Sequence, residues 1–561
     1  MKLKNKHLFW IAALLAAISF DLLFWERSFG INFFIFILLA VFGGLIPTWL
    51  ENMSIPWTSY LLLVPLGFFS VMTFIRAEPF TTAINVLLTI SALALFLITL
   101  RNGAWYRYSL RDHLVSGIHF LLNNIIGGIL FFNKAKKSEP PQPGETKIKD
   151  NISSDESKQA LEDERDEQVR KDSPFKAVTP YLRGLLLALP VLVILAFFLA
   201  QADPIFNDRI QNFFSYFRIE NLGEIVFRLV YILVIAYVLL SSYYFAVVES
   251  KKYQHDEEEK PAISPFLGSI ESSVILGAVN LLFLFFVILQ LNYLFSGGKN
   301  ISLQGYTYAE YARRGFFELI VVAVISLVLF YILSMITKRE RQIQGRLFSV
   351  LGLTLVGLVV IILISAYTRL NLYETAYGFT RLRTLAHVFM IWIGLLLAGV
   401  AVLELTKKMK RLALILIIFI VGFGLTINLL NIDRFIVNQN ITRTINGVDN
   451  NAESNLDSGY LFSLSADAIP SLVEFYTDNK IPEDVRDEIG GVLACKFSGI
   501  EKPQDKSWVS YHYSRNQANT LLEKQSENLE AYPVSYDMYT WFVEVNGEVK
   551  SCSGYETDPY D

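Results

Sequence analysis

The sequence predicts an all-α polytopic transmembrane helix bundle of about eleven spans, with a small α+β extracytoplasmic domain at its C-terminal end. Composition is the first observation, since 53% of the 561 residues are hydrophobic and 18% are charged, whereas soluble domains have roughly 45–50% and about 25%. The second is that the hydrophobic residues gather in runs of about twenty, the length that crosses a bilayer as a helix. The third is that residues 133–172 and 432–561 are ordinary polar sequence.

Eleven runs are long and apolar enough to span a membrane. An isolated segment of this length satisfies its backbone hydrogen bonds in lipid only as a helix. The spans are predicted at residues 8–25, 31–50, 57–75, 80–100, 181–200, 225–247, 272–294, 315–336, 347–367, 383–403 and 412–430. The first four make a four-helix N-terminal membrane region, residues 1–100, and the other seven make a membrane domain, residues 173–431.

Two different segments separate these regions. Residues 101–132 begin basic and aromatic and end apolar, which is typical of an amphipathic helix in the membrane interface. The alternative is that this segment crosses the membrane, which would invert the orientation of everything after it. Residues 133–172 combine mixed charges and a Pro cluster with almost no large apolar side chains, so burial cannot offset the entropy of ordering them. We predict a disordered cytoplasmic linker there.

The distribution of Lys and Arg predicts the orientation of the bundle. Short cytoplasmic loops carry an excess of these residues. With the N-terminus in the cytoplasm, eleven spans place on the inner side the basic clusters Lys2–Lys6, Arg101–Arg111, Lys251–Lys252, Lys338–Arg346 and Lys407–Arg411. The same threading puts the C-terminal domain, residues 432–561, outside the cytoplasm.

The C-terminal domain has its own folding signals. The stretch SADAIPSLVEFY, residues 465–476, has a helical pattern. The stretch TWFVEVNGEVKSC, residues 540–552, alternates apolar and polar residues around Asn546-Gly547, which is a strong hairpin signal. Together they predict a small α+β fold.

The only two cysteines of the chain, Cys495 and Cys552, both lie in this domain. An oxidising exterior favours pairing them, and closing a loop of that length stabilises a fold by about 4 kcal/mol in the chain-entropy model. We therefore predict a disulfide. The alternative is a pair of buried, unlinked thiols.

Several polar residues fall inside the predicted spans. A charge at the centre of a bilayer costs about 2.5–3.5 kcal/mol on insertion scales, and most of these residues avoid that cost. Asp21 and Glu318 lie about one turn from the outer end of a span, where a carboxylate can reach headgroups or an arginine. The uncharged residues are expected to bond across helices; they are Asn85, Asn280, Gln290, His387 and Asn428.

A set of charged residues and tyrosines shares one depth at the outer ends of the spans, and we name it the outer mouth. Its members are Asp203, Glu310, Arg313, Arg314, Glu318, Arg369, Tyr373, Glu374, Tyr377, Arg381, Arg383, Asp433 and Arg434. Arginine binds carboxylate or phosphate through two hydrogen bonds, and helix N-termini attract anions. The set could therefore hold an anionic lipid headgroup or a lipid-linked substrate. Alternatively, its acids and arginines pair with one another and fasten loops to the outer domain.

Several classes of activity lack their motifs in this chain. The sequence contains no GxxxxGK[ST], HExxH or GxSxG pattern and no zinc-ligand spacing of Cys and His, so nucleotide hydrolysis, metalloprotease and serine hydrolase chemistry are without support. No basic tract with interleaved aromatics indicates a nucleic-acid surface. We expect no cofactor and no metal, and the sequence leaves the oligomeric state open.

Several phrases resemble one family. They include YTYAEYARRGFFELIVVA, LYETAYGFTRLRTLAHVFMIW, NIDRFIVNQNITR and LSADAIPSL, and they are similar to bacterial multi-pass membrane proteins catalogued as domain of unknown function 4173, related to the 4153 group. The resemblance covers about residues 180–520 and leaves out the first four spans and the linker. It implies a fold and a bacterial plasma (inner) membrane location, without an activity.

Two functions follow as hypotheses. The first is an integral membrane protein of unknown activity, non-enzymatic and either an envelope or a transporter-like protein, with the outward-facing mouth as its distinctive feature. The second is a membrane-embedded transferase acting on a lipid-linked anionic substrate, with Asp203, Glu374 or Asp433 as acid, base or metal ligand. The second needs a closely spaced acidic pair in an outer loop, for which WERSFG after the first span is a weak candidate.

Overall fold

The computed structural model describes residues 5–134, 199–215, 222–251, 265–295, 316–339, 341–447, 456–499, 507–537 and 540–552, with a few isolated positions between 188 and 196. The chain forms two compact units. The larger joins residues 1–127 to residues 239–561. The smaller, residues 128–238, contributes α9 (Pro204–Ser215) and most of α10 (Leu222–Tyr244).

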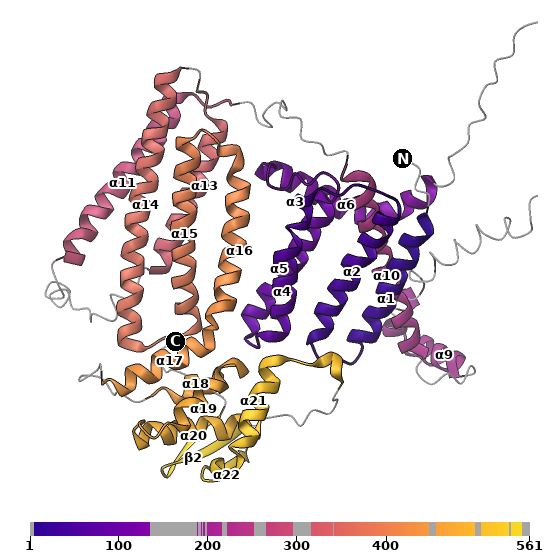
Figure 1. Ribbon diagram of the computed structural model, residues 1–561, viewed down its shortest axis with the longest axis vertical. Coiled ribbons are helices and arrows are strands. Elements are labelled where there is room, and N and C mark those ends of the chain that lie inside the picture. The colour runs from indigo at the N-terminus through magenta and orange to yellow at the C-terminus, as the bar shows by residue number, and fades with distance from the viewer. Residues whose placement is uncertain are drawn as a thin grey trace, which may run out of the picture. The chain divides into compact units, whose positions relative to one another are not determined.

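Helices dominate the described residues (Figure 1), and ten of them are long and apolar enough to cross a membrane. Ten of the eleven predicted spans coincide with these helices, and the eleventh, residues 181–200, lies mostly outside the described residues. The spans are formed by α1 (Lys6–Phe24), α2 (Ile31–Leu50), α3 (Trp57–Tyr60) with α4 (Leu63–Ile75), α5 (Pro79–Thr99), α10 with the π-helix Phe245–Glu249, α11 (Ser269–Phe295), α13 (Phe316–Ile336), α14 (Gln342–Tyr377), α15 (Arg381–Leu405), and the 3-10 turn Met409–Arg411 with α16 (Leu412–Leu430). The chain is thus a multi-pass integral membrane protein.

The segment predicted to lie in the interface forms a helix, α6 (Leu110–Lys134). Its start is capped by Asp112, whose Oδ2 accepts from the Ser109 amide at 2.8 Å. Further along the helix, the side-chain amide of Asn123 donates to the Ser241 carbonyl at 3.1 Å, so α6 packs against the last turn of α10. The predicted linker, residues 133–172, lies outside the described residues except for its first two positions.

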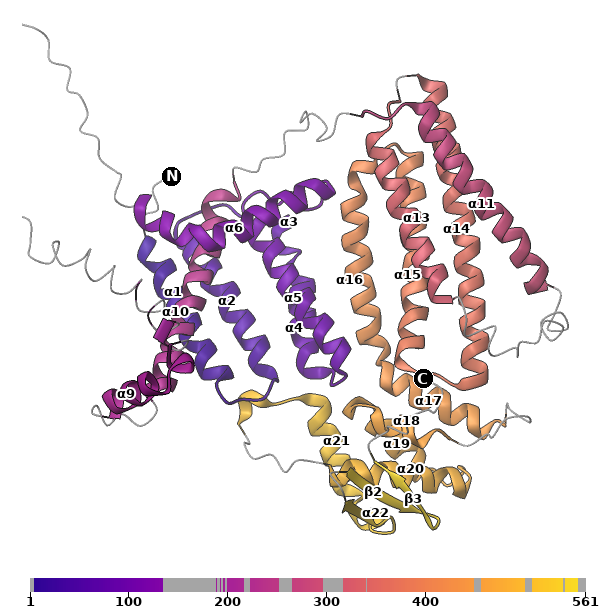
Figure 2. The same cartoon turned by 180° about the vertical axis from the view of Figure 1, so that it is seen from behind.

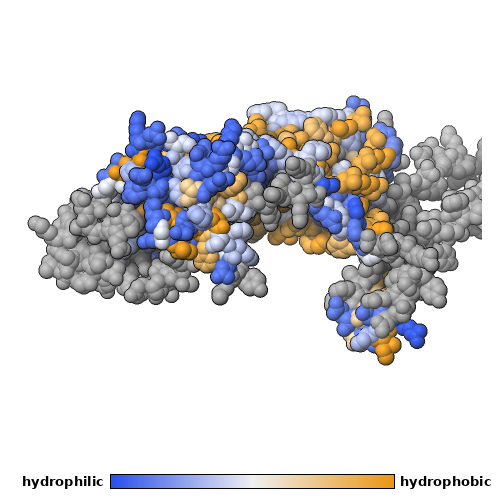
Figure 3. Space-filling view, turned by 90° about the horizontal axis from the view of Figure 1, so that it is seen from below, coloured by the Kyte–Doolittle hydropathy of each residue, from blue (hydrophilic) through white to orange (hydrophobic). Residues whose placement is uncertain are grey.

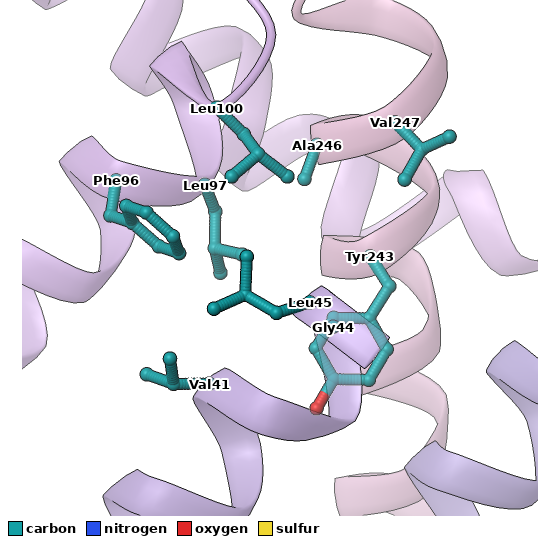
Figure 4. Close-up of a pocket in the computed structure, with 9 residues that line it drawn as sticks. All are labelled: Val41, Gly44, Leu45, Phe96, Leu97, Leu100, Tyr243, Ala246 and Val247. Carbon is teal, nitrogen blue, oxygen red and sulfur yellow. The ribbon is translucent and has the colours of Figure 1, made fainter. Parts of the chain in front are cut away.

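Tyr243 of α10 fills the space between α2 and α5. Its hydroxyl donates to the Ala40 carbonyl at 2.7 Å, and Gly44 makes room for the ring, because a Cβ there would meet the Tyr243 Cδ1 at 3.0 Å. A narrow hollow remains beside the ring (Figure 4), and the Tyr243 hydroxyl is the only polar side-chain group among its nine lining residues. Such an apolar gap between close-packed helices has no group that would orient a polar ligand.

Helices α11, α13, α14, α15 and α16 share one apolar core. Two of the polar residues predicted to bond across helices do so here. Asn280 donates to the Leu351 carbonyl at 2.9 Å, and Gln290 accepts from the Ser365 hydroxyl. These bonds fix α11 against α14, since each satisfies a polar group that lipid could not.

The C-terminal elements gather at one end of the membrane helices, as both views show (Figures 1 and 2). They are α17 (Ile432–Ile445), α18 (Ser458–Ser463), the 3-10 turn Ala466–Ala468, α19 (Ile469–Thr477), α20 (Glu483–Ser498), the 3-10 turn Trp508–Ser510, α21 (Tyr513–Lys524), α22 (Ser526–Leu529), β1 (Val534–Asp537), β2 (Thr540–Val545) and β3 (Glu548–Ser551). Viewed from below, hydrophilic residues gather over these elements, with hydrophobic surface beside them (Figure 3).

The strands form a three-stranded antiparallel sheet in the order β1-β2-β3. Asn546 and Gly547 turn between β2 and β3 with φ of 52° and 81°, the left-handed pair that a tight hairpin needs. The sheet packs on α20, where Val543 and Leu493 are fully buried. The predicted α+β fold and its hairpin are therefore present.

Cys495 of α20 and Cys552, just after β3, are joined by a disulfide, with their Cα atoms 5.7 Å apart. The bond ties the end of the sheet to the helix that covers it. It closes a loop across 57 positions of sequence. No free cysteine is present in the chain.

Candidate functional site

The site is built around the turn between α4 and α5, which consists of Arg76, Ala77 and Glu78. Helix α5 begins with Pro79 at its first position, where a missing amide hydrogen does no harm. Glu78 caps this helix, accepting from the amides of Phe80 at 3.0 Å and Thr81 at 2.6 Å. Capping by a carboxylate also suits the positive end of the helix dipole. The turn is therefore held to the start of α5 by the Glu78 carboxylate.

Arg381 and Asp433 make a two-armed ion pair next to this turn. The arginine Nε lies 2.7 Å from Oδ1 and its Nη2 lies 2.6 Å from Oδ2. Asp433 is fully buried and also accepts from the Ser465 amide at 2.7 Å. Glu78 adds a second acid, with its Oε1 3.8 Å from the arginine Nε. Helices α15 and α17 both begin at this ion pair, since Arg381 is the first residue of α15 and Asp433 lies in the first turn of α17.

Two further residues surround the ion pair. Tyr460 accepts from the Arg381 amide at 2.7 Å through its hydroxyl. Lys496 of α20 donates its Nζ to the carbonyls of Phe462 at 2.9 Å and Leu464 at 2.6 Å. Burial lowers the pKa of Lys496 to about 8, with Asp433 acting in the opposite direction. The centre of the site thus contains two cations and two acids that face one another.

Asp467 connects the C-terminal domain to the α4–α5 turn. Its Oδ2 accepts from the amides of Ala77 at 2.8 Å and Glu78 at 3.1 Å, and its Oδ1 bonds the Ser514 hydroxyl. Ser514 also donates to the carbonyl of Ile75 at 2.6 Å. Burial raises the pKa of Asp467 above its ordinary value, while these hydrogen bonds act to lower it. Residues nearly 400 positions apart are therefore directly bonded.

Arg76 ties the same turn to α16. Its Nε and Nη2 donate to the Asn428 carbonyl at 2.8 and 2.5 Å. The Asn428 side chain exchanges two hydrogen bonds with Asn85 of α5, at 2.9 and 2.7 Å. Asn85 and Asn428 are both fully buried. The predicted bonding of Asn85 and Asn428 across helices is confirmed.

The turn between α14 and α15 is held in a similar way. Asn440 of α17 bonds both the amide and the carbonyl of Phe379, at 2.7 and 2.9 Å. Arg383 donates to the Gly378 carbonyl at 2.6 Å, and its guanidinium lies 4.0 Å from the centre of the Tyr373 ring. A backbone carbonyl and an aromatic face therefore stabilise this guanidinium within the chain.

Glu374 and His387 form a buried pair just inside the bundle. The His387 Nδ1 lies 3.2 Å from Oε2 of Glu374, and its ring stacks on Tyr367 with centroids 4.5 Å apart. Glu374 is fully buried, and neither of its oxygens accepts a hydrogen bond from the described residues. His387 therefore lies beside a buried carboxyl group, a contact that was not predicted from the sequence.

The predicted outer mouth is brought together in part. Arg381 and Asp433 pair, and Tyr373, Glu374, Tyr377 and Arg383 surround the α14–α15 turn. Arg434 is exposed with Glu474 3.9 Å away, Glu318 is exposed, and Arg369 is half-buried. Asp203, in the smaller unit, is exposed and caps α9 through the Ile205 amide at 2.8 Å. Glu310, Arg313 and Arg314 lie outside the described residues.

Several side chains of the site were not predicted from the sequence; they include Arg76, Glu78, Asn440, Tyr460, Asp467, Lys496 and Ser514. One signal could have indicated the first two, because RAEP supplies two charges between adjacent spans and Glu-Pro is a helix start. No local signal connects either residue to Asp467. Among the described residues, no three His, Cys, Asp or Glu side chains are grouped so that they could hold a metal ion.

Fold and site define a class: multi-pass membrane proteins with a small α+β domain fastened to one end of the helix bundle by buried ion pairs. The chain belongs to the family described as Domain of unknown function (DUF4153), whose model matches residues 63–475. The expected relation to the 4153 group is confirmed, while the label 4173 is not shown. The match begins in the third span and includes the linker, so it extends further toward the N-terminus than the resemblance implied. No curated protein and no solved structure shows a significant match.

Proposed function

We propose that the protein is a non-enzymatic envelope or transporter-like protein of a bacterial plasma membrane, with its N-terminus in the cytoplasm and its C-terminal domain outside. In this proposal, the acids and arginines of the outer mouth clamp the domain onto the bundle. The pairing of Arg381 with Asp433 carries the proposal, because an acid of the chain itself occupies Nε and Nη2 of the guanidinium in the two-bond geometry with which arginine binds anions.

The charge distribution along the helices supports this orientation. Helices α5 and α15 begin beside the C-terminal domain and end at the opposite side, where they are followed by Arg101–Arg111 and Lys407–Arg411. Basic residues at span ends favour the cytoplasm. The disulfide between Cys495 and Cys552 supports an oxidising location for the other end.

The burial of the acids favours the clamp over the transferase. A general acid or base must reach a substrate. Asp433 is fully buried with both oxygens bonded, and Glu374 is buried against His387. Asp203 is exposed, but its carboxylate caps its own helix. Of the three candidate acids, only Asp203 is therefore accessible. The alternative, a membrane transferase acting on a lipid-linked anionic substrate, has no accessible pair of acids among these candidates in the described residues.

Sidedness is tested with reporters. Alkaline phosphatase, which folds only outside the cytoplasm, is fused after Asp561, and a fusion within residues 133–172 serves as the cytoplasmic control. We expect activity only from the first fusion. Activity from the linker fusion alone would invert the assignment and remove the outward-facing mouth.

Enzymatic function is tested separately, in cells that lack the chromosomal copy and express Asp433→Asn or Glu374→Gln. Membrane extracts are compared for lipid-linked products at matched protein abundance. We expect both variants to leave the product profile as in wild type. Loss of one product from a variant that remains abundant would support the transferase.

A further inference from the structure

A short segment of the C-terminal domain exposes three aromatic rings. Trp508 is 71% exposed, Tyr511 41% and Tyr513 47%. The residues between them point the other way, since Val509 and His512 are buried. Successive side chains of an extended chain face opposite sides, and the backbone of Tyr511 and His512 is extended. The segment therefore has one face in the protein and an aromatic face directed away from it, which we name the aromatic edge.

The inner face of this segment is bonded to the ends of two membrane spans. The Tyr511 carbonyl accepts from the amide of Ile31, the first residue of α2, at 2.9 Å. The Ser514 hydroxyl donates to the carbonyl of Ile75, the last residue of α4, at 2.6 Å. Both spans end where the hydrocarbon gives way to headgroups. The aromatic edge is therefore fixed at the depth of the membrane interface.

Gly30 shows how closely the segment approaches the span. A Cβ at this position would lie 2.6 Å from the Tyr511 carbonyl oxygen and 2.7 Å from the Ser510 carbonyl carbon. Only glycine leaves room for backbone against backbone here. The position of the aromatic edge is thus set by main-chain contact and does not depend on a flexible side chain.

We propose that the aromatic edge inserts into the headgroup layer of the bilayer, so that the C-terminal domain contacts lipid as well as the helix bundle. Tryptophan and tyrosine suit this layer because their rings are apolar and their N–H and O–H groups bond to water and headgroups. Three exposed aromatic rings in one short segment indicate a partner. At the end of a span, the adjoining surface is lipid.

The location also favours lipid over a protein partner. Phe29, in the α1–α2 turn next to Gly30, is 36% exposed, and the centre of its ring lies 6.4 Å from that of Phe24 in α1 and 5.3 Å from that of Phe33 in α2. An exposed apolar side chain at the ends of two spans therefore adjoins the glycine that the aromatic edge contacts. The inference is independent of the proposed function, because it holds on either side of the membrane.

The test uses full-length protein in vesicles of phosphatidylethanolamine and phosphatidylglycerol, with a nitroxide label on Trp508→Cys. The native cysteines are paired, so the new thiol is the one that reacts. Val549→Cys is the matched control, since Val549 is 69% exposed on β3 of the same domain. Collisions of each label with oxygen, which concentrates in lipid, and with a water-soluble nickel chelate are measured by power saturation.

We expect the ratio of oxygen to chelate collisions to be several-fold higher at position 508 than at 549. Equal ratios would show that the aromatic edge lies in water and would overturn the proposal. Low collision rates with both reagents at 508 would show a covering protein partner or second copy, which would also overturn it. Because Trp508 is mostly exposed, its replacement leaves the core intact, and circular dichroism of both variants verifies this.

Discussion

The Nη2 of Arg381 lies 2.6 Å from Oδ2 of Asp433, and this contact joins the start of α15 to the start of α17. The acid is fully buried and the arginine largely so. Breaking a buried ion pair by removing one partner leaves an uncompensated charge, which costs about 3–5 kcal/mol. The pair therefore makes docking of the C-terminal domain depend on both residues.

Replacing Arg381 with Ala is expected to destabilise the protein by about 3–5 kcal/mol, because Asp433 keeps its charge without its main partner. Thermal unfolding of the purified protein in detergent measures the loss. Arg434→Ala is the control, since Arg434 is exposed and 3.9 Å from an exposed acid, a contact worth about 0–1 kcal/mol. Equal effects of the two substitutions would contradict the clamp.

Gly30 gives a second test of docking. Adding a methyl group through Gly30→Ala forces the Tyr511 backbone away, and overpacking of this kind costs about 1–3 kcal/mol. Gly67→Ala, in the interior of α4, is the control because nothing lies within 4 Å of its added Cβ. Limited proteolysis of the C-terminal domain measures the result. A domain equally resistant in both variants would show that the contact with α2 does not hold it.

The helices of this protein could be predicted from sequence, whereas the contacts of the site could not. Hydropathy is a property of each segment by itself, so ten spans could be predicted, although α14 extends to Tyr377, beyond the predicted end at residue 367. The hairpin at Asn546-Gly547 was predictable for the same reason. Asp467 reaches Ala77 and Glu78 across almost 400 residues, and no local pattern encodes such a partner. Arg381 and Asp433 were both recognised as mouth residues, but only tertiary packing shows that they neutralise each other. Hydrogen bonding of Asn85 was predictable because lipid offers no alternative.

Acid is expected to weaken docking through His512. Burial, with a contribution from Arg515, lowers the pKa of this imidazole to about 4, from about 6.5 when unfolded. Between these values the unfolded state binds the extra proton, so stability falls as pH decreases from 6.5 through 4. The full loss is about 3 kcal/mol.

This dependence is isolated by comparing wild type with His512→Gln at several pH values, because the carboxylates titrate in both proteins. We expect the difference in unfolding free energy between the two proteins to be constant above pH 6.5, and to shift against the wild type by about 3 kcal/mol as the pH falls from 6.5 through 4. Parallel curves at all pH values would show that His512 is not buried as a neutral group.

The pairing of Glu374 with His387 makes the two residues unequal in their response to substitution. Removing the imidazole with His387→Ala leaves the buried carboxyl group of Glu374 without its nearest polar neighbour, and an unsatisfied buried polar group costs about 1–3 kcal/mol. Glu374→Gln keeps the shape and a polar group at this position, so we expect a smaller loss. Thermal unfolding of the two variants in detergent compares them directly. The loss in the double variant, His387→Ala with Glu374→Gln, should be smaller than the sum of the two single losses, because each single variant already removes the contact. If the free-energy losses of the two single variants instead add up in the double variant, the two residues do not interact.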